Sequence, residues 1–353
     1  MKRLLCLALL LLQASMALAQ GDGDYLDVSI RVFTSVEAPG VAAASTEGTT
    51  AAPPAPVTPE VRLAETRYLP MFLRYRLEAS GRFGAVRVVP DFDNSAQLTI
   101  EGVIQRSDGQ TLAIDVAARD STGRVWLAQR YEGAAVPGVS LNGDALAEDD
   151  FAGLFAAIVR DLTAAQDELS AEQRAEIRTV ALLRYGLALV PASFAGYLQE
   201  NPDGTVSILR LPAADDPILR RIEQIREHEY LFIDVVDEEY QRFFGDIKPV
   251  YAMWRRFQRE QSSSSSAFAT RETTAESVYA RGSYYALRES YDNYAWAKVQ
   301  EIYLDELREG FANEVKPTEL ELESSLYTLT GSLEQQYSEW RSILAELYAL
   351  ETE

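Results

Sequence analysis

The sequence contains few of the residues that most often carry chemistry. Cys6 is its only cysteine and His228 its only histidine. A lone cysteine allows no disulfide within the chain, and a lone histidine excludes metal sites built from several imidazoles. The serine-hydrolase patterns G-x-S-x-G and S-x-x-K are absent as well. We therefore expect no bound metal and no cofactor, and we expect the protein not to be an enzyme of the thiol, multi-histidine or serine type.

Long apolar runs and positive charge are also scarce. After residues 4–12, no stretch approaches the roughly 20 apolar residues that a membrane-spanning helix needs. The formal net charge is −21, whereas nucleic acids and anionic membrane surfaces are bound through basic patches. We expect no transmembrane segment and no nucleic-acid partner.

The first 19 residues have the parts of a secretory signal peptide. Lys2 and Arg3 precede the short apolar run, and Ala17-Leu18-Ala19 has the small-x-small pattern that signal peptidases accept. We expect cleavage near Ala19, which would leave a periplasmic or secreted protein.

Residues 20–135 are predicted to form an α+β module. Segments 25–33 and 85–90 alternate apolar and polar residues as half-buried strands do. Between them, Thr58-Pro59-Glu60 is typical of a helix start, and the helix should run to about Ser80, with Pro70 either kinking it or marking its real beginning. Residues 35–57, rich in Ala, Thr, Gly and Pro, are expected to be a flexible insertion.

The clearest pattern in this module is a β-meander from 97 to 132. Three alternating runs are separated by Ser107-Asp108-Gly109 and Ser121-Thr122-Gly123, where glycine supplies the positive φ of tight hairpin turns. The strand-helix-strand unit followed by an antiparallel meander predicts an α+β fold with a helix on one sheet face.

The rest of the chain is predicted to be mainly helical. A linker at 136–150 leads to a short-helix bundle at 151–212, whose third helix contains Phe194, Tyr197 and Leu198. Residues 213–312 should form a long helical hairpin: a helix beginning at Asp216-Pro217, a serine-rich turn at 262–266, and a second helix packed antiparallel on the first. Residues 313–353 are expected to form a small ββα tail, which is a β-hairpin followed by a helix.

The first domain resembles known envelope modules. The runs LEASGRFGAVRVVP, AQLTIEGVIQ and DVAARDSTGRVWLAQRY, with Asp120, Gly123 and Trp126 in a D-x-x-G-x-x-W pattern, are similar to the TolB amino-terminal domain, the curli-secretion lipoprotein and the penicillin-binding-protein activator lipoproteins. The whole chain also resembles secreted proteobacterial proteins of no assigned activity. The resemblance covers 25–132 and implies a docking or assembly module with no catalytic residues. The ββα tail is similar to the end of a BON domain, a phospholipid-binding envelope module.

Two sets of residues are candidates for a binding surface. Arg106, Asp115 and Arg119 should lie on the polar face of the sheet. The second long helix is unusually rich in aromatic residues, which bury a large area at low entropic cost. Its candidates are Tyr284, Tyr285, Tyr291, Tyr294 and Trp296, although a packed core would also explain them.

Carboxylates offer the one route to catalysis that the composition leaves open. Asp234, Asp237 and Glu238 are spaced i, i+3 and i+4 on one helix face, which would suit acid-base work or a hard cation but in so acidic a chain is more typical of a solvated face. His228 lies between two glutamates and is expected to be a solvated helix residue.

The sequence thus favours a non-enzymatic binding or assembly protein of the cell envelope that docks on an envelope protein or cell-wall polymer. A carboxylate-dependent envelope hydrolase or lyase is the first alternative. A structural homo-oligomer that self-associates through the long helices is the second.

Overall fold

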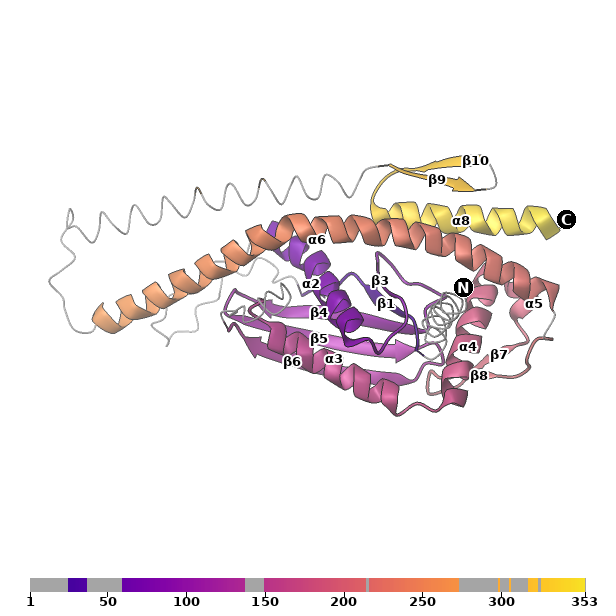
Figure 1. The fold of residues 1–353 in the computed structure, drawn as a ribbon, viewed down its shortest axis with the longest axis horizontal. Coiled ribbons are helices and arrows are strands. Elements are labelled where there is room, and N and C mark those ends of the chain that lie inside the picture. Colours follow the sequence, from indigo (N-terminus) through magenta and orange to yellow (C-terminus); the bar gives the residue numbers. More distant parts are fainter. Residues whose placement is uncertain are drawn as a thin grey trace, which may run out of the picture.

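The computed structural model describes residues 25–36, 59–136, 149–213, 216–272, 298, 305, 317–322 and 325–352. Over these residues the chain has the mixed α+β architecture that the sequence predicts (Figure 1). Most of the predicted insertion at 35–57 lies outside the described residues. So do nearly all of the predicted second helix of the long hairpin and its five aromatic candidates.

A six-stranded sheet forms the base of the molecule. Its main path has the order β3-β1-β4-β5-β6, and the short β2 extends the pairing along β4. β1 lies parallel to both β3 and β4, whereas β4, β5 and β6 form the predicted antiparallel meander. The strands are β1 (Val28–Arg31), β2 (Thr34–Ser35), β3 (Val86–Val89), β4 (Leu98–Ser107), β5 (Thr111–Asp120) and β6 (Val125–Ala134).

The meander forms where the alternation and the glycines require it. In β5, the side chains of Leu112, Ile114, Val116 and Ala118 are buried and those of Ala117 and Arg119 are exposed. Gly109 and Gly123 have φ values of 79° and 87° at the two turns, a left-handed conformation that glycine adopts without steric cost. We call the face with the buried side chains the inner face and the opposite one the outer face.

Two helices cover the inner face (Figure 1). They are α2 (Pro59–Ser80) and α3 (Ala152–Asp167). The predicted helix from Pro59 to Ser80 is confirmed, and because it is continuous through Pro70, that proline does not mark its beginning. Tyr68, Phe72 and Leu77 of α2 are buried in one core with side chains of the sheet, and the ring of Phe72 packs edge to face on Phe155 of α3.

The predicted short-helix bundle contains a β-hairpin that the sequence reading missed. α4 (Ala171–Leu189) begins with a capping box at Ser170, as predicted, and α5 (Pro191–Phe194) is a single turn. The expected third helix stops there, because Leu198 already belongs to β7 (Leu198–Glu200), which pairs with β8 (Val206–Ile208). Strands of three residues are too short to show an alternation of period two.

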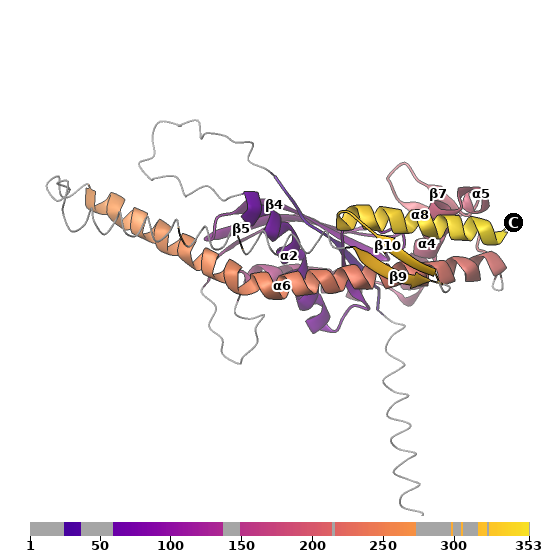
Figure 2. The same cartoon turned by 90° about the horizontal axis from the view of Figure 1, so that it is seen from above.

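A single long helix spans the molecule. α6 (Pro217–Glu272) has 56 residues, and its first part packs on α2 and β3 while its far end projects beyond the sheet (Figure 2). The predicted apolar stripe is buried from Ile222 to Trp254. The predicted turn at 262–266 is wrong, since α6 continues through the serine run. Serine has a helix propensity only about 0.5 kcal/mol per residue below alanine, and the run contains no glycine or proline to end a helix that is already formed.

The predicted β-hairpin and last helix are confirmed. They are β9 (Thr318–Leu322), β10 (Ser325–Leu329) and α8 (Leu333–Thr352), which lies along α6 (Figure 1). The rings of Tyr337 and Trp340 stack on Phe232 of α6 at centroid distances of 5.8 and 6.4 Å. One continuous hydrophobic core therefore contains side chains from the sheet, α2, α3, α4, α6 and α8.

A buried polar cluster fixes α6 where it leaves the sheet. Arg255 donates two hydrogen bonds to Asp149, at 3.1 and 2.5 Å, and its guanidinium lies 4.4 Å from the ring centroid of Tyr251. The Tyr251 hydroxyl in turn donates to Glu65 of α2 at 2.6 Å. The side chains of Arg255 and Asp149 are only 2% and 4% exposed, so neither charge has access to bulk water as compensation.

Breaking this buried ion pair should destabilise the fold. Asp149→Asn leaves the Arg255 guanidinium buried without its counter-charge, which typically costs on the order of 3–5 kcal/mol of unfolding free energy. The partly exposed pair of Arg242 and Glu239 on α6 is the matched control, since Glu239→Gln should cost less than about 1 kcal/mol. Urea unfolding at constant m-value measures both. Equal losses for the two variants would contradict a structural role of the Asp149 pair.

Candidate functional site

The two predicted sheet arginines lie at opposite ends of the outer face. Arg106 pairs across the sheet with Ala113 near the β4–β5 turn, and it forms an ion pair with Asp108 at 2.7 Å. Arg119 lies at the other end of β5, opposite Val125 of β6. The structure therefore does not bring Arg106 and Arg119 together. Asp115, between them, pairs with Arg130 at 2.6 Å.

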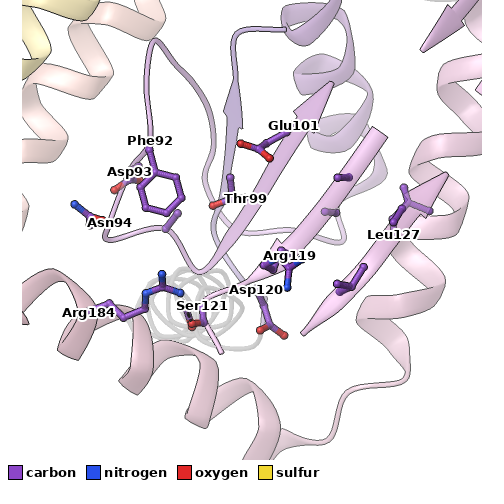
Figure 3. A pocket seen from close by; sticks show the side chains of 15 residues that line it. Phe92, Asp93, Asn94, Thr99, Glu101, Arg119, Asp120, Ser121, Leu127 and Arg184 are labelled. Carbon is purple, nitrogen blue, oxygen red and sulfur yellow. Dashed lines mark hydrogen bonds between the residues drawn. The ribbon is translucent and has the colours of Figure 1, made fainter. Parts of the chain in front are cut away.

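Arg119 lines a groove of about 250 Å³ at its end of the outer face (Figure 3). Three parts of the chain bound the groove: the loop after β3, the strands of the meander, and α4, which contributes Arg184. Two large apolar side chains at its border are exposed, Phe92 by 39% and Val125 by 48%. The outer-face residues Ala117 and Ala128 also line the groove, so it opens onto a strip of small side chains.

One turn holds both arginines of the groove. Arg119 donates to the carbonyl of Gly123 at 2.6 Å, and Arg184 donates to the carbonyl of Ser121 at 2.9 Å. Each guanidinium has five N–H donors in a fixed fork, so one bond to a carbonyl orients the group and leaves further donors. We call Arg119 and Arg184 the arginine pair.

The D-x-x-G-x-x-W motif builds that turn. One carboxylate oxygen of Asp120 accepts from the backbone N–H and the hydroxyl of Thr122 and from the N–H of Arg124, and the other accepts from the indole N–H of Trp126 at 2.9 Å. Gly123 packs so closely on the carbonyl of Gly204 that an added Cβ would lie 2.4 Å from that oxygen.

The arginine pair is electrostatically unusual in this acidic chain. Burial lowers the pKa of Arg184 below its usual value; nearby Glu200 opposes this shift, and the positive charge of Arg119 adds to it. Within the part of the chain that the structure describes, neither arginine forms an ion pair with a carboxylate. The groove therefore presents two neighbouring cations whose charges repel each other.

The three carboxylates proposed for catalysis lie on α6 in three different environments. Asp237 is buried, accepts from the backbone N–H of Val88 at 2.9 Å and pairs with Arg74 at 3.0 Å. Asp234 pairs with Arg87 at 2.6 Å, and Glu238 is exposed. None of the three lines either of the two cavities described here. Two of them hold α6 against β3, which is a structural task.

Glu229, which the sequence reading did not single out, lies in a second cavity of about 290 Å³ between α4, α6 and α8. It is 1% exposed and accepts from the hydroxyl of Tyr337 at 2.7 Å, and the guanidinium of Arg341 lies 3.7 Å away. Burial raises the pKa of Glu229 above its ordinary 4.5, and the negative charge of Asp93 raises it further, against Tyr337 and Arg341. The neighbouring His228 is half-buried, and its carbonyl accepts from Trp340.

Arg184 and Glu229 were missed because nothing local distinguishes them. Each is one charged residue among many on an amphipathic helix, and each becomes notable only through contacts with parts of the chain far away in sequence. Arg184 meets Ser121 across 63 positions, and Glu229 meets Tyr337 across 108.

The chain matches no protein-family model, no curated protein and no solved structure. The resemblance to envelope assembly modules therefore stays a prediction. Among the described residues there is no cluster of three or more His, Cys, Asp or Glu side chains arranged to hold a metal ion. No helix within the described ranges is long and apolar enough to cross a membrane.

The close contact at Gly123 can be tested against a matched glycine. Gly204 has a similar φ of 80°, but an added Cβ there would meet nothing within 4 Å. Gly204→Ala should cost only the backbone strain, about 1 kcal/mol, whereas Gly123→Ala adds a clash and should cost about 2 kcal/mol more. Chemical unfolding of the two variants measures the difference. Equal losses would show that the two turns are not packed on each other.

The buried Glu229 should make stability depend on pH. Because its folded pKa is raised, the folded protein binds more protons than the unfolded chain above pH 4.5, so its contribution to stability is complete below that pH and is lost as pH rises toward the folded pKa. Glu229→Gln should flatten this decline above pH 4.5, measured as unfolding free energy in urea. Tyr337→Phe removes a hydrogen bond that lowers the pKa, so it should extend the decline to higher pH. Parallel pH profiles for all three proteins would contradict the assignment.

Proposed function

We propose that this protein is a non-enzymatic binding protein of the cell envelope that docks on an envelope protein through the outer face of its sheet. The observation that carries this proposal is that the described helices leave most of the outer face of β4, β5 and β6 uncovered, with Glu101, Ala117 and Ala128 exposed, while α4 reaches this face at the groove. Proteins usually bury both faces of a sheet or keep the solvated face strongly polar. This face is polar along much of its length, but it ends in a groove with two exposed apolar side chains and the arginine pair.

The composition of the outer face supports contact with another protein. Glu101, Arg130 and Glu132 are exposed on this face, while the directly opposed Ala117 of β5 and Ala128 of the edge strand β6 are small and exposed beside the groove. Such a surface lets a partner backbone approach closely over the alanines, with charged groups around the contact. Apolar side chains at the centre with a polar rim are typical of transient protein interfaces.

The carboxylate hydrolase receives less support from the geometry. Asp234 and Asp237 are engaged by Arg87 and Arg74, and a general acid or base must instead reach a bound substrate. Self-association through the long helices rests on side chains of the second helix that lie outside the described residues.

Site-specific photocrosslinking tests the docking face. A benzoylphenylalanine in place of Ala117 or Ala128 should crosslink a discrete partner in cells, because both positions line the groove on the proposed docking face. The same group in place of Glu223, an exposed residue of α6, is the control and should give no such product. Crosslinks of equal yield at all three positions, or turnover of a cell-wall substrate by the purified protein, would contradict the proposal.

A further inference from the structure

We propose that the groove binds the carboxy-terminal end of a partner protein, with the arginine pair holding the terminal carboxylate and an apolar last side chain resting between Phe92 and Val125. This inference rests on the proposed docking function and names the chemistry that the partner presents. It follows from the charge, the apolar border and the closed end of the groove.

The arginine pair is preorganised to bind an anion. Both guanidiniums are fixed by carbonyls of the same β5–β6 turn, at 2.6 and 2.9 Å, so little side-chain freedom is lost when a ligand binds. Arginine forks match the two oxygens of a carboxylate, and such charge-assisted hydrogen bonds are about twice as strong as neutral ones. Bringing in one negative charge also relieves the repulsion between the two cations.

The other charges of the groove favour an ion of single charge. Glu101, Asp93 and Asp120 line it as well, but each has donors of its own. Glu101 pairs with Arg31 at 2.5 Å, Asp93 accepts from Ser29 at 2.8 Å, and Asp120 is bound within its turn. These carboxylates would repel a phosphate dianion more strongly than a carboxylate. The net charge of −21 adds to that discrimination at long range.

The shape of the groove favours a chain end over an acidic side chain within a segment. On one side it opens along Ala117 and Ala128, where an extended segment can lie on the sheet. At the other side α4 and Arg184 close it (Figure 3). A peptide that enters along the alanines therefore ends at the arginine pair, and its last side chain falls beside Phe92 and Val125, which are exposed in the unbound protein.

Paired peptides test the inference directly. The probes are acetylated Ala-Ala-Ala-Xaa tetrapeptides with Leu, Val, Ile or Phe as the last residue, each as the free acid and as the carboxy-terminal amide. Binding is measured by isothermal titration at low ionic strength. The intact protein should bind at least one acid about tenfold or more tighter than its amide, and 0.5 M NaCl should reduce this preference.

Variants separate the arginine pair from other positive charges. Arg119→Gln and Arg184→Gln should each remove most of the preference for the acid, with unfolding midpoints recorded to confirm that the variants fold. Arg160→Gln, which changes an exposed arginine of α3 on the other side of the sheet, should keep it. Should one glutamine variant not fold, the other still decides the matter, because each arginine is required.

Several outcomes would overturn the inference. These are equal affinity for acid and amide, no binding of any acid up to millimolar concentration, or a preference that persists in both glutamine variants. Tighter binding of an amidated peptide with an internal aspartate would assign the groove to acidic side chains instead. Crosslinks at Ala117 and Ala128 that persist in the glutamine variants would support the proposed docking face but contradict recognition of a carboxylate by the arginine pair. If those crosslinks are absent from the intact protein, the proposed docking function itself is contradicted.

Discussion

The carboxylate of Asp237 joins the two halves of this structure. β3 is an edge strand, and an edge leaves backbone N–H groups without partners. Asp237 of α6 accepts from one of them, the N–H of Val88, and it forms an ion pair with Arg74, whose Nε donates to the carbonyl of Val86. One side chain therefore ties the long helix to the sheet and to α2. Burial raises the pKa of Asp237 even with these donors, which shows how fully α6 excludes water from this edge.

A second carboxylate has a similar role near the other edge of the sheet, on β5. Asp120 shapes the β5–β6 turn, and the carbonyls of that turn orient Arg119 and Arg184. The D-x-x-G-x-x-W motif is therefore architectural in its own contacts and yet decides where the arginine pair lies. The hydroxyl of Ser121 also donates to the carbonyl of Ile177, so the position of α4 depends on the same turn. A motif that folds a turn can in this way determine the lining of a groove.

The sequence reveals what repeats locally, and this covers most of the fold. Alternation with glycines at the turns predicts the meander, and the apolar stripe predicts α6 as far as Trp254. The serine run misleads because a drop in helix propensity resembles a break, although it is small beside the stability of a long packed helix. β7 and β8 were missed because three residues cannot display a period.

The candidate site could be predicted only in part, for a different reason. Arg119 was found because it alternates outward along a strand, but its partner Arg184 comes from a helix whose charged residues all look alike. Asp149 was assigned to a linker, yet it is buried against Arg255, 106 positions away. Ion pairs of this kind depend on which helix crosses which strand, and a local pattern holds no information about that crossing.

The arginine pair is unusual because the chain is so acidic. With 54 acidic and 33 basic residues, a cation has many carboxylates within reach, and Arg31, Arg74, Arg87 and Arg255 have each found one. Two neighbouring guanidiniums that are instead bound to backbone carbonyls are an exception to that general neutralisation. The repulsion between the two guanidiniums is unfavourable in the unbound protein. It persists because the β5–β6 turn holds both side chains in place. An anionic ligand removes that repulsion on binding, so part of its affinity would come from the arrangement of the protein itself.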